Sequence, residues 1–304
     1  MQLSILIPTY KQACFSLVEQ VHSQAMGIAG LQFEILVADD GTPKDHPSHQ
    51  DNRQINALEH CQLIVHSENV GRSANRNFLA EKSQYPFLLF IDSHMKVDND
   101  RLLANYIAHL DEKTVVYGGY DIPTPLSREQ RHFLRARYED HCRKQLITEQ
   151  RQKQPYQHLH TGNILLPKAV MQRLPFDQSF RDYGYEDVIY GKNLQEYNIA
   201  ILHIDNPVFF SSFESNAAFM EKTRQAILTL VKHRNKLEGY STLVSYYNKL
   251  EKWHLVPLLR LMYKAIRRPL HRNLLSNHPS VTGFQIYKLG LFATTLKQLQ
   301  ETSK

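Results

Sequence analysis

The sequence predicts an α/β fold, a mostly parallel sheet flanked by helices, with a C-terminal helical extension. Three observations support this. Short β-rich runs alternate with stretches of helical spacing over the first ~120 residues, and repeated β–α units favour a parallel sheet covered by helices. The run 87–91 is continuously apolar, as expected of a strand buried on both faces. After Ser215 the pattern indicates helix to the end of the chain.

The expected elements follow one another in a regular order. The strands are expected at 3–7, 33–38, 63–66, 87–91 and 114–117, and the helices at 15–25, 72–82 and 101–110. A charged helical stretch covers 128–153, and mixed polar and aromatic residues occupy 160–187. In the C-terminal part, breaks between helices are expected near Gly239, Pro257, Pro269 and Pro279.

Charge is distributed unevenly between two expected domains, 1–215 and 216–304. The formal net charge is +6, yet the segment 221–304 alone has 15 Lys and Arg against 4 Asp and Glu, a net of +11. The rest of the chain is therefore mildly acidic. A basic extension on an acidic domain suggests a separate anionic partner, which an anionic membrane, an anionic substrate or nucleic acid would each provide.

Composition and cysteine content exclude several classes of protein. Apolar residues make up 42% and charged residues 22% of the chain, so a folded core is expected. Three cysteines without CxxC spacing argue against a disulfide framework and against a structural zinc site. A reducing, cytoplasmic location is the simpler interpretation. We find no secretory signal and no apolar run of ~18 residues that would span a membrane.

Polar residues follow each of the first four expected strands. Parallel sheets bind ligands at the carboxyl ends of their strands, so these residues are the candidates for a site. The four groups are Pro8-Thr9-Tyr10, Asp39-Asp40-Gly41-Thr42, Glu68-Asn69-Val70-Gly71 and Asp92-Ser93-His94.

Two of these groups, Asp39–Thr42 and Asp92–His94, carry the candidate carboxylates. Asp92 and His94 are two residues apart at a strand end, so both project to the same side. Together they offer a hard oxygen and a nitrogen, a pair that suits Mn²⁺ better than Ca²⁺. Asp39 and Asp40 could accept hydrogen bonds from a base or a ribose. Ordinary turns at strand ends are the alternative interpretation of both groups.

Two further groups lie at expected helix starts. Gly71 allows close backbone approach, and a helix N-terminus with Arg72 and Arg76 favours phosphate. A capped helix with solvated arginines is the alternative. Further on, Glu186 and Asp187 follow a glycine, as expected of a general base presented at a helix start. Acidic residues also stabilise helix N-termini without any catalytic role.

Taken together and in order, these groups resemble the family-two glycosyltransferases, which have the GT-A (Rossmann-like) fold. The resemblance covers about residues 1–215. It rests on Ser4–Tyr10, Asp39–Thr42, Asn69–Asn77, Phe90–His94, Gly162-Asn163 and Gly184–Asp187. It implies a hexosyltransferase-like enzyme that transfers a sugar, with inversion, from a nucleotide-diphosphate sugar. A UDP-sugar donor is favoured, Mn²⁺ or Mg²⁺ assists, and the acceptor is a glycan or a lipid-linked molecule in polysaccharide or cell-surface glycan biosynthesis.

The resemblance also assigns residues to roles. Asp92 and His94 would occupy the family's Asp-x-Asp metal motif, and Asp187, or otherwise Glu186, would be the catalytic base. Asp39 or Asp40 would contact the base or the ribose. The full expected set for the nucleotide sugar is Pro8, Thr9, Tyr10, Asp39, Asp40, Asn69, Gly71, Arg72, Arg76, Asp92, Gly162 and Asn163.

Two departures from the family pattern concern the metal. The second acid of the motif is His94, a change that some related GT-A enzymes share. Many relatives have a late histidine near the position of 206–210, where this chain has Phe209 and Phe210, which cannot bind a metal. His203 is close in sequence, but we expect it to be packed within a strand.

The basic extension contains a segment, 253–268, that mixes apolar and basic residues. One face of it could lie in a membrane interface, with Lys264, Arg267 and Arg268 near anionic headgroups. Our hypothesis is peripheral association with the inner face of the plasma membrane. The alternative is a helical subdomain whose apolar face packs on the first domain.

Three rival functions remain for this sequence. A glycosyltransferase-like protein that binds nucleotide sugar but has lost turnover would explain the departures at the metal site. A nucleic-acid-binding protein using the basic extension would need an aromatic RNA-binding signature or zinc spacing, and the chain has neither, so we expect no nucleic acid partner. A nucleotidyltransferase usually has an early Gly-rich loop, which residues 8–12 lack.

Overall fold

The computed structural model describes residues 1–302, which form two compact units. The first unit comprises Met1–Asp121, Lys144–Arg181 and Tyr190–Ser212. The second comprises Ile122–Arg143, Asp182–Ile189 and residues 213–302. The second unit thus contains the basic extension together with two segments from earlier in the chain.

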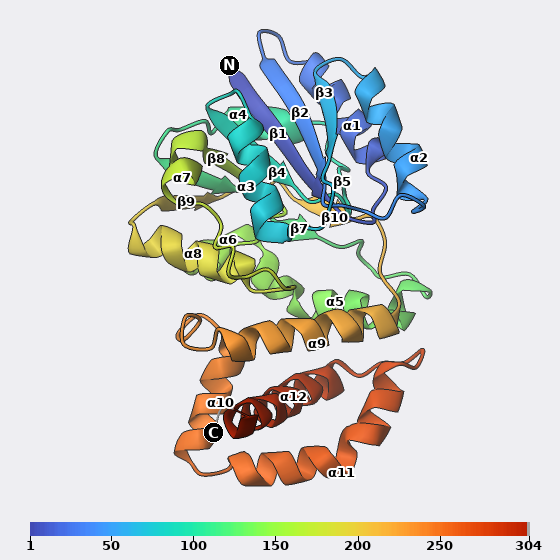
Figure 1. Cartoon of the computed structure of the whole chain (residues 1–304), viewed down its shortest axis with the longest axis vertical. Coiled ribbons are helices and arrows are strands. Elements are labelled where there is room, and N and C mark those ends of the chain that lie inside the picture. The colour runs from blue at the N-terminus through green and yellow to red at the C-terminus, as the bar shows by residue number, and fades with distance from the viewer. Residues whose placement is uncertain (303–304) are drawn as a thin grey trace. The chain divides into compact units, whose positions relative to one another are not determined.

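A seven-stranded sheet forms the centre of the first unit (Figure 1). Its order is β3-β2-β1-β4-β8-β6-β9, and only β8 runs antiparallel to its neighbours β4 and β6. The expected, mostly parallel sheet is therefore confirmed. The strands are β1 (Gln2–Thr9), β2 (Gln32–Asp39), β3 (Cys61–Val65), β4 (Phe87–Ile91), β6 (Thr114–Tyr117), β8 (Asn163–Pro167) and β9 (Ala200–His203).

A second, small sheet in the same unit joins three short strands. In the order β5-β10-β7 these are β5 (Met95–Lys96), β10 (Val208–Phe210) and β7 (Tyr120–Asp121). Because β5 follows directly on the segment after β4, this sheet brings residues 208–210 next to the segment that carries Asp92 and His94.

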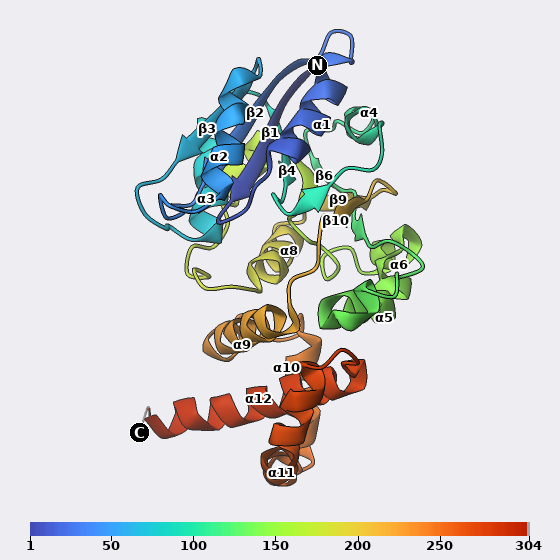
Figure 2. The same ribbon diagram turned by 90° about the vertical axis from the view of Figure 1, so that its right-hand side faces the viewer.

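Helices cover both faces of the large sheet, as continuously apolar strands require. On one face lie α3 (Arg72–Lys82) and α7 (Lys168–Arg173). Leu79 of α3 and Val170 of α7 share a hydrophobic core with side chains of the sheet such as Phe90. On the other face lie α1 (Phe15–Met26) and α4 (Leu102–Ile107) (Figure 2). Shorter elements of this unit are α2 (Ser48–Asn52), η1 (Arg53–Ala57) and α6 (Thr148–Lys153).

The second unit is helical. Its main helices are α9 (Asn216–Lys232), α10 (Thr242–Lys252), α11 (Val256–Leu274) and α12 (Val281–Thr302), with η2 (Gln130–His132). Helices α5 (Leu134–Leu146) and α8 (Glu186–Glu196) begin in this unit and end in the first. Within the unit α12 lies between α9 and α11 (Figure 1) and contributes Phe284 and Tyr287 to an aromatic core.

Start signals in the sequence explain where the C-terminal helices begin. The side chain of Ser215 accepts a hydrogen bond from the backbone N–H of Ala218, and Ser241 does the same for Val244. Each serine satisfies one of the four N–H groups that a helix start leaves without a partner. The expectation of helix after residue 215 is confirmed.

One expected break does not occur. Helix α11 continues through Pro269, although proline lacks the N–H that would bond to the fourth residue before it. Figure 1 shows that α11 bends along its length. Beyond the proline, Leu274 is fully buried and Leu270 packs against the same core, so tertiary packing holds the last turn in place. Pro257 instead lies in the first turn of α11, where proline is tolerated.

No helix in the described part of the chain is long and apolar enough to cross a bilayer.

The close approach of α11 and α12 generates a first prediction. Gly290 of α12 faces Tyr263 of α11, and a Cβ atom at position 290 would overlap the tyrosine ring. We therefore expect Gly290→Ala to lower the free energy of unfolding by roughly 1–3 kcal/mol, the usual result of overpacking, measured by urea unfolding. Gly27→Ala is the control, because its Cβ would make only ordinary contacts. Equal stability of the two variants would contradict this packing.

Candidate active site

The carboxyl ends of β1, β2 and β4 lie side by side and bring the first predicted residues together. Thr9 pairs in register with Asp39, and Pro8 with Ala38. Thr9 is buried, and its hydroxyl donates a hydrogen bond to the carbonyl of Gln12 at 3.0 Å. Tyr10 is exposed beyond the strand end. This edge of the sheet is where the sequence placed the site.

Asp40 joins the end of β2 to the loop that precedes α3. Its carboxylate accepts hydrogen bonds from the backbone N–H of Val70 (2.7 Å) and of Gly71 (3.1 Å), and from the side-chain amide of Asn69 (3.1 Å). Burial raises the pKa of Asp40 above its ordinary value, and the two backbone donors partly oppose this. The side chains of Asp40 and Asn69 are thus engaged with each other in building the loop.

Gly41 and Gly71 give this loop its shape. Both have positive φ angles, +69° and +94°, which L-residues with side chains rarely adopt. A Cβ atom on Gly41 would overlap the backbone of Glu68 and Asn69. Glycine at 41 therefore permits the contact between the turn after β2 and the loop before α3.

Asp39 is buried beside Asp40 but has different partners. Its Oδ1 accepts a hydrogen bond from the N–H of Thr42 at 2.9 Å, and its Oδ2 lies 3.9 Å from His49 Nδ1. The Thr42 hydroxyl in turn accepts from the N–H of Lys11 at 2.8 Å. The end of β1 and the turn after β2 are tied together in this way.

A buried ion pair occupies the end of β4. Arg76, on the buried side of α3, places Nη2 2.6 Å from Asp92 Oδ1. Arg72, one turn earlier, places Nη2 3.6 Å from Asp92 Oδ2, and its side chain is 35% exposed. The arginines of α3 that the sequence predicted for phosphate therefore converge on the predicted metal ligand.

The charge of Asp92 is set by these neighbours. Burial alone would raise its pKa, but the positive charges of Arg76 and Arg72, with His94 and His160, hold the pKa of that carboxyl well below its usual range. Asp92 is thus a carboxylate at neutral pH. Its Oδ2 is buried and accepts no hydrogen bond from the described residues, which is unusual for a buried oxygen.

Gly162 and Asn163 lie directly against this pair, at the start of β8. The N–H of Asp92 donates to the carbonyl of Gly162 at 3.1 Å, and a Cβ atom at 162 would lie 3.0 Å from Asp92 Oδ2. Asn163 is buried, and its side-chain amide donates to the carbonyls of Gly119 and Asn206. Gly162 leaves space beside the carboxylate, and Asn163 fixes the surrounding backbone.

His94 lies in the turn after Asp92, beside strand β10. Its ring centroid is 5.7 Å from that of Phe210, and its carbonyl accepts hydrogen bonds from the backbone N–H and the hydroxyl of Ser211. Segment 206–210, where many relatives have a late histidine, thus lies next to His94, and the side chain that contacts His94 is Phe210. Among the described residues no group of three or more His, Cys, Asp or Glu side chains could hold a metal ion.

His160 is a neighbour of Asp92 to which the sequence assigned no role. It precedes Gly162 by two residues, and its Nδ1 would lie 3.1 Å from a Cβ atom at 162. It also acts electrostatically on Asp92. A histidine before a Gly-Asn pair was the only signal available, because β4 and β8 pair across a long stretch of chain.

His203 lies in β9 and is buried, as expected. Its Nε2 is 3.0 Å from the carbonyl of Pro155, and its ring packs edge-on against Tyr117. Burial, with the nearby charge of Arg151, lowers the pKa of His203 to about 4. A neutral, packed histidine follows.

The predicted base residues begin α8, in the part of the helix that belongs to the second unit. Gly184 has a φ of +98°, and Glu186 and Asp187 form the acidic first turn of the helix. Glu186 is buried and Asp187 is partly exposed. Of the two carboxylates, Asp187 has the greater access to solvent.

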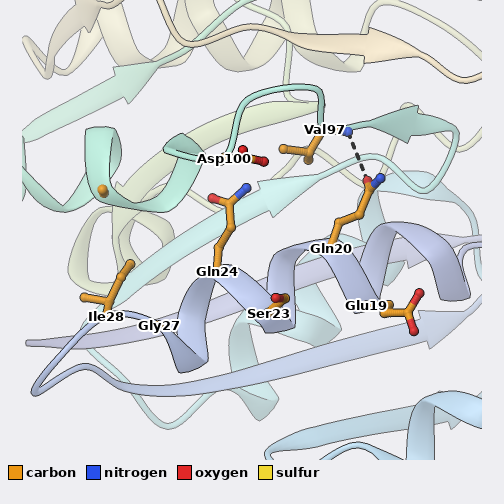
Figure 3. A pocket seen from close by; sticks show the side chains of 9 residues that line it. Glu19, Gln20, Ser23, Gln24, Gly27, Ile28, Val97 and Asp100 are labelled. Carbon is orange, nitrogen blue, oxygen red and sulfur yellow. Dashed lines mark hydrogen bonds between the residues drawn. The ribbon is translucent and has the colours of Figure 1, made fainter.

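A pocket of about 580 Å³ lies elsewhere in the first unit, between α1 and the segment after β5 (Figure 3). Gln24 donates to the carbonyl of Asn99 at 2.8 Å, and Gln20 accepts from the N–H of Val97 at 3.4 Å. None of the predicted site residues lines this pocket. We therefore keep the ends of the strands, and not this pocket, as the candidate active site.

Comparison with known protein families gives a match over the first part of the chain. The model of the family described as "Glycosyl transferase family 2" matches residues 4–175, more than half of the chain. A search of curated protein sequences gave no match.

Solved structures with a similar fold include TarS and a mannosyltransferase. TarS from S. aureus, residues 1–349, matches with a TM-score of 0.51 at 16% identity, covering 99% of this chain and 92% of that chain, and its complex with UDP gives the same values. The mannosyltransferase PcManGT from Pyrobaculum calidifontis, in complex with GDP-Man and Mn²⁺, has a TM-score of 0.55 at 11% identity, covering 98% and 87%. The GT-A fold is thereby confirmed.

The buried ion pair predicts how stability depends on pH. The pKa of Asp92 is lower in the folded chain than the ordinary value of about 3.9, so its stabilising effect is complete above that value and is lost as pH falls below it. At neutral pH, Asp92→Asn should lower the free energy of unfolding by about 3–5 kcal/mol, because the buried Arg76 would lose the opposite charge of the Asp92 carboxylate.

The measurement is urea unfolding of both proteins with chelator present, from neutral pH to about pH 3, where the ordinary carboxyl is mostly protonated. The difference between them should shrink as the pH falls. Arg72→Gln is the matched control, with a loss of at most about 1 kcal/mol, because this pair is longer and partly exposed. A difference that stays constant with pH would show that Asp92 is not held ionised by folding.

Proposed function

Because this chain belongs to glycosyl transferase family 2, we propose that it transfers a hexose from a nucleotide-diphosphate sugar to a glycan or lipid-linked acceptor. The observation that carries this proposal is the buried Asp92 carboxylate at the ligand-binding edge of the sheet, with two arginines beside it and one oxygen that accepts no hydrogen bond. Such an arrangement suits a leaving diphosphate, whose negative charge grows as the bond to the sugar breaks.

A nucleoside diphosphate is supported as the leaving group by the solved relatives. TarS was solved with UDP, and the mannosyltransferase with GDP-Man and Mn²⁺. We infer a UDP-sugar as the preferred donor. Asp39 and Thr9 would lie next to the base and the ribose. Asp40 and Asn69, with Gly41 and Gly71, hold the loop at 69–71 in shape.

The side chains at the strand ends fit a divalent cation with few protein ligands. Asp92 Oδ2 is a buried oxygen that accepts no hydrogen bond from the described residues, and His94 supplies a nitrogen two residues later. Mg²⁺ is usually held by one or two protein groups together with substrate phosphates. When bound, such an ion would neutralise charge on the diphosphate. Arg72, partly exposed, would contribute a further positive charge from the protein itself.

Asp187 is our choice for the base. In an inverting displacement the acceptor oxygen forms a bond to the anomeric carbon as the bond to the diphosphate oxygen breaks, and the acceptor proton passes to a carboxylate. Asp187 is partly exposed at a helix start, whereas Glu186 is buried. The greater exposure of Asp187 supports this choice, because a sugar hydroxyl reaches an exposed carboxylate more readily than a buried one.

A second candidate function is binding of nucleotide sugar without turnover. The contact between Phe210 and His94 favours it, because an apolar ring occupies the segment where many relatives have a histidine. The two functions differ in product formation.

For the acceptor we propose a glycan or lipid-linked intermediate of polysaccharide or cell-surface glycan biosynthesis, used at the inner face of the plasma membrane. The basic helices of the second unit support a location at an anionic surface.

The proposal is tested by incubating the protein with UDP-, GDP-, dTDP- and CMP-activated sugars, Mn²⁺ and a panel of glycan and lipid-linked acceptors, and measuring nucleotide release and sugar transfer to the acceptor. One donor should be consumed far faster than the others, and the product should have the inverted anomeric configuration by NMR. Binding of a donor without any turnover would favour the second candidate function, and no binding of any donor would contradict both.

The base assignment gives a prediction. Asp187→Asn should lower the rate of transfer by on the order of 10²–10⁴-fold, the usual contribution of a positioned base, while calorimetric donor binding persists because the variant keeps its shape. Glu186→Gln is the comparison, with a smaller loss expected. Near-normal turnover of Asp187→Asn beside an inactive Glu186→Gln would assign the base to Glu186.

A further inference from the structure

Helix α11 carries charge of one sign only. Its 19 residues include five Lys and Arg and no Asp or Glu. Its inner side packs on α12, with Val256, Tyr263 and Leu274 buried. In Figures 1 and 2, α11 lies on the side of α12 away from α9. The opposite side of α11 is therefore the outer surface of this unit.

That outer side is apolar where a water-facing helix would be polar. Leu258, Leu261 and Met262 are 53%, 67% and 56% exposed, and their spacing of three and four residues places them on one stripe. Trp253, just before the helix, is 65% exposed. Large apolar side chains gathered on one surface, bordered by charge, mark an interaction site.

A cationic pocket lies further along α11. It has a volume of about 370 Å³ and is formed by α11 and α12. Its lining contains three arginines and a histidine but no acidic side chain: Tyr263, Arg267, Arg268, His271, Arg272 and Tyr287. Arg267, Arg268 and Arg272 make no ion pair or side-chain hydrogen bond with the described residues. No acidic side chain in the described part of the chain therefore pairs with these three arginines.

The two tyrosines of the pocket add hydrogen-bond donors to its lining. Glu221 of α9, which acts electrostatically on Tyr287, is itself paired with Arg224 at 2.7 Å. Burial raises the pKa of Tyr263 to about 12, so its phenol keeps its proton. Two tyrosine hydroxyls and three guanidinium groups suit the oxygens of a phosphate.

We propose that the outer side of α11 is a docking surface for an anionic phospholipid bilayer, with the pocket between α11 and α12 receiving a lipid phosphate. Leu258, Leu261 and Met262 would enter the boundary between headgroups and acyl chains, while Arg267, Arg268 and Arg272 would lie at the level of the phosphates. An apolar stripe flanked by basic residues is the pattern of helices that lie in the membrane interface.

The apolar stripe also discriminates between anionic partners. Nucleic acid would contact the arginines through phosphate, but it would leave the exposed leucines and Trp253 in water. A bilayer accommodates both kinds of side chain at once. The basic charge of the unit is complementary to anionic headgroups, each Lys or Arg near the surface adding to binding.

The test is flotation of the full-length chain with two kinds of vesicle, pure phosphatidylcholine and phosphatidylcholine mixed with phosphatidylglycerol. We expect binding to the anionic vesicles only. Arg267→Gln, Arg268→Gln and Arg272→Gln together should lower the partition coefficient on the order of 100-fold. Replacing the same arginines by lysine should retain most of the binding, because the charge remains.

The apolar contribution has its own variant. Leu258→Ser with Leu261→Ser should lower partitioning by roughly tenfold or more, since both side chains lose their apolar burial in the bilayer. A matched control removes three exposed cations from the first unit, with Arg53, Arg101 and Lys113 each changed to Gln, and should bind within about twofold of the unaltered protein because these residues lie outside α11. Circular dichroism verifies that each variant is folded.

Several results would overturn the proposal. These are equal binding to neutral vesicles, no effect of the arginine variant, no effect of the leucine variant, or arginine-dependent binding of a duplex oligonucleotide in place of vesicles. Docking on a bilayer would bring the enzyme to a lipid-linked acceptor, and in this respect the inference rests on the proposed function. Flotation needs neither donor nor acceptor, so failure of sugar transfer and failure of membrane binding are observed separately.

Discussion

The ion pair between Asp92 and Arg76 is the constraint on which the candidate site depends. Both side chains are almost wholly buried, and a buried charge is tolerated only when an opposite charge lies close to it. The pair fixes α3 against the end of β4, and Gly162 leaves space at the remaining carboxylate oxygen. A carboxylate kept ionised in this way can bind a cation, which in turn can bind a diphosphate.

Much of the fold followed from hydrophobic pattern alone. Helix Arg72–Lys82 and strand Phe87–Ile91 have the predicted bounds, because periodicity and a buried apolar run are local signals. The continuation of α11 through Pro269 was not predictable, because it depends on core contacts made by residues beyond the proline. For a similar reason the sequence predicted that Thr9, Asp39 and Asp92 lie at the carboxyl ends of strands, since strand ends are local features.

The sequence could not predict which side chains from different strands and helices contact one another. Arg76 was expected at a phosphate, and the structure pairs it with Asp92. Asp40 was expected at a base or ribose, and its carboxylate is engaged by the loop at 69–71. His160 was passed over although it lies beside Asp92. In each case a side chain meets a residue from another strand or helix, and spacing along the chain carries no information about that contact.

We propose that the strand ends form a donor site for a nucleoside diphosphate. The most direct measurement is calorimetric titration of UDP and GDP into the unaltered protein, each with and without Mn²⁺. The account predicts that one of the two diphosphates binds and that Mn²⁺ strengthens the binding, because the Oδ2 of Asp92 is the buried oxygen that can take the ion. Failure of both diphosphates to bind, with and without Mn²⁺, would contradict it.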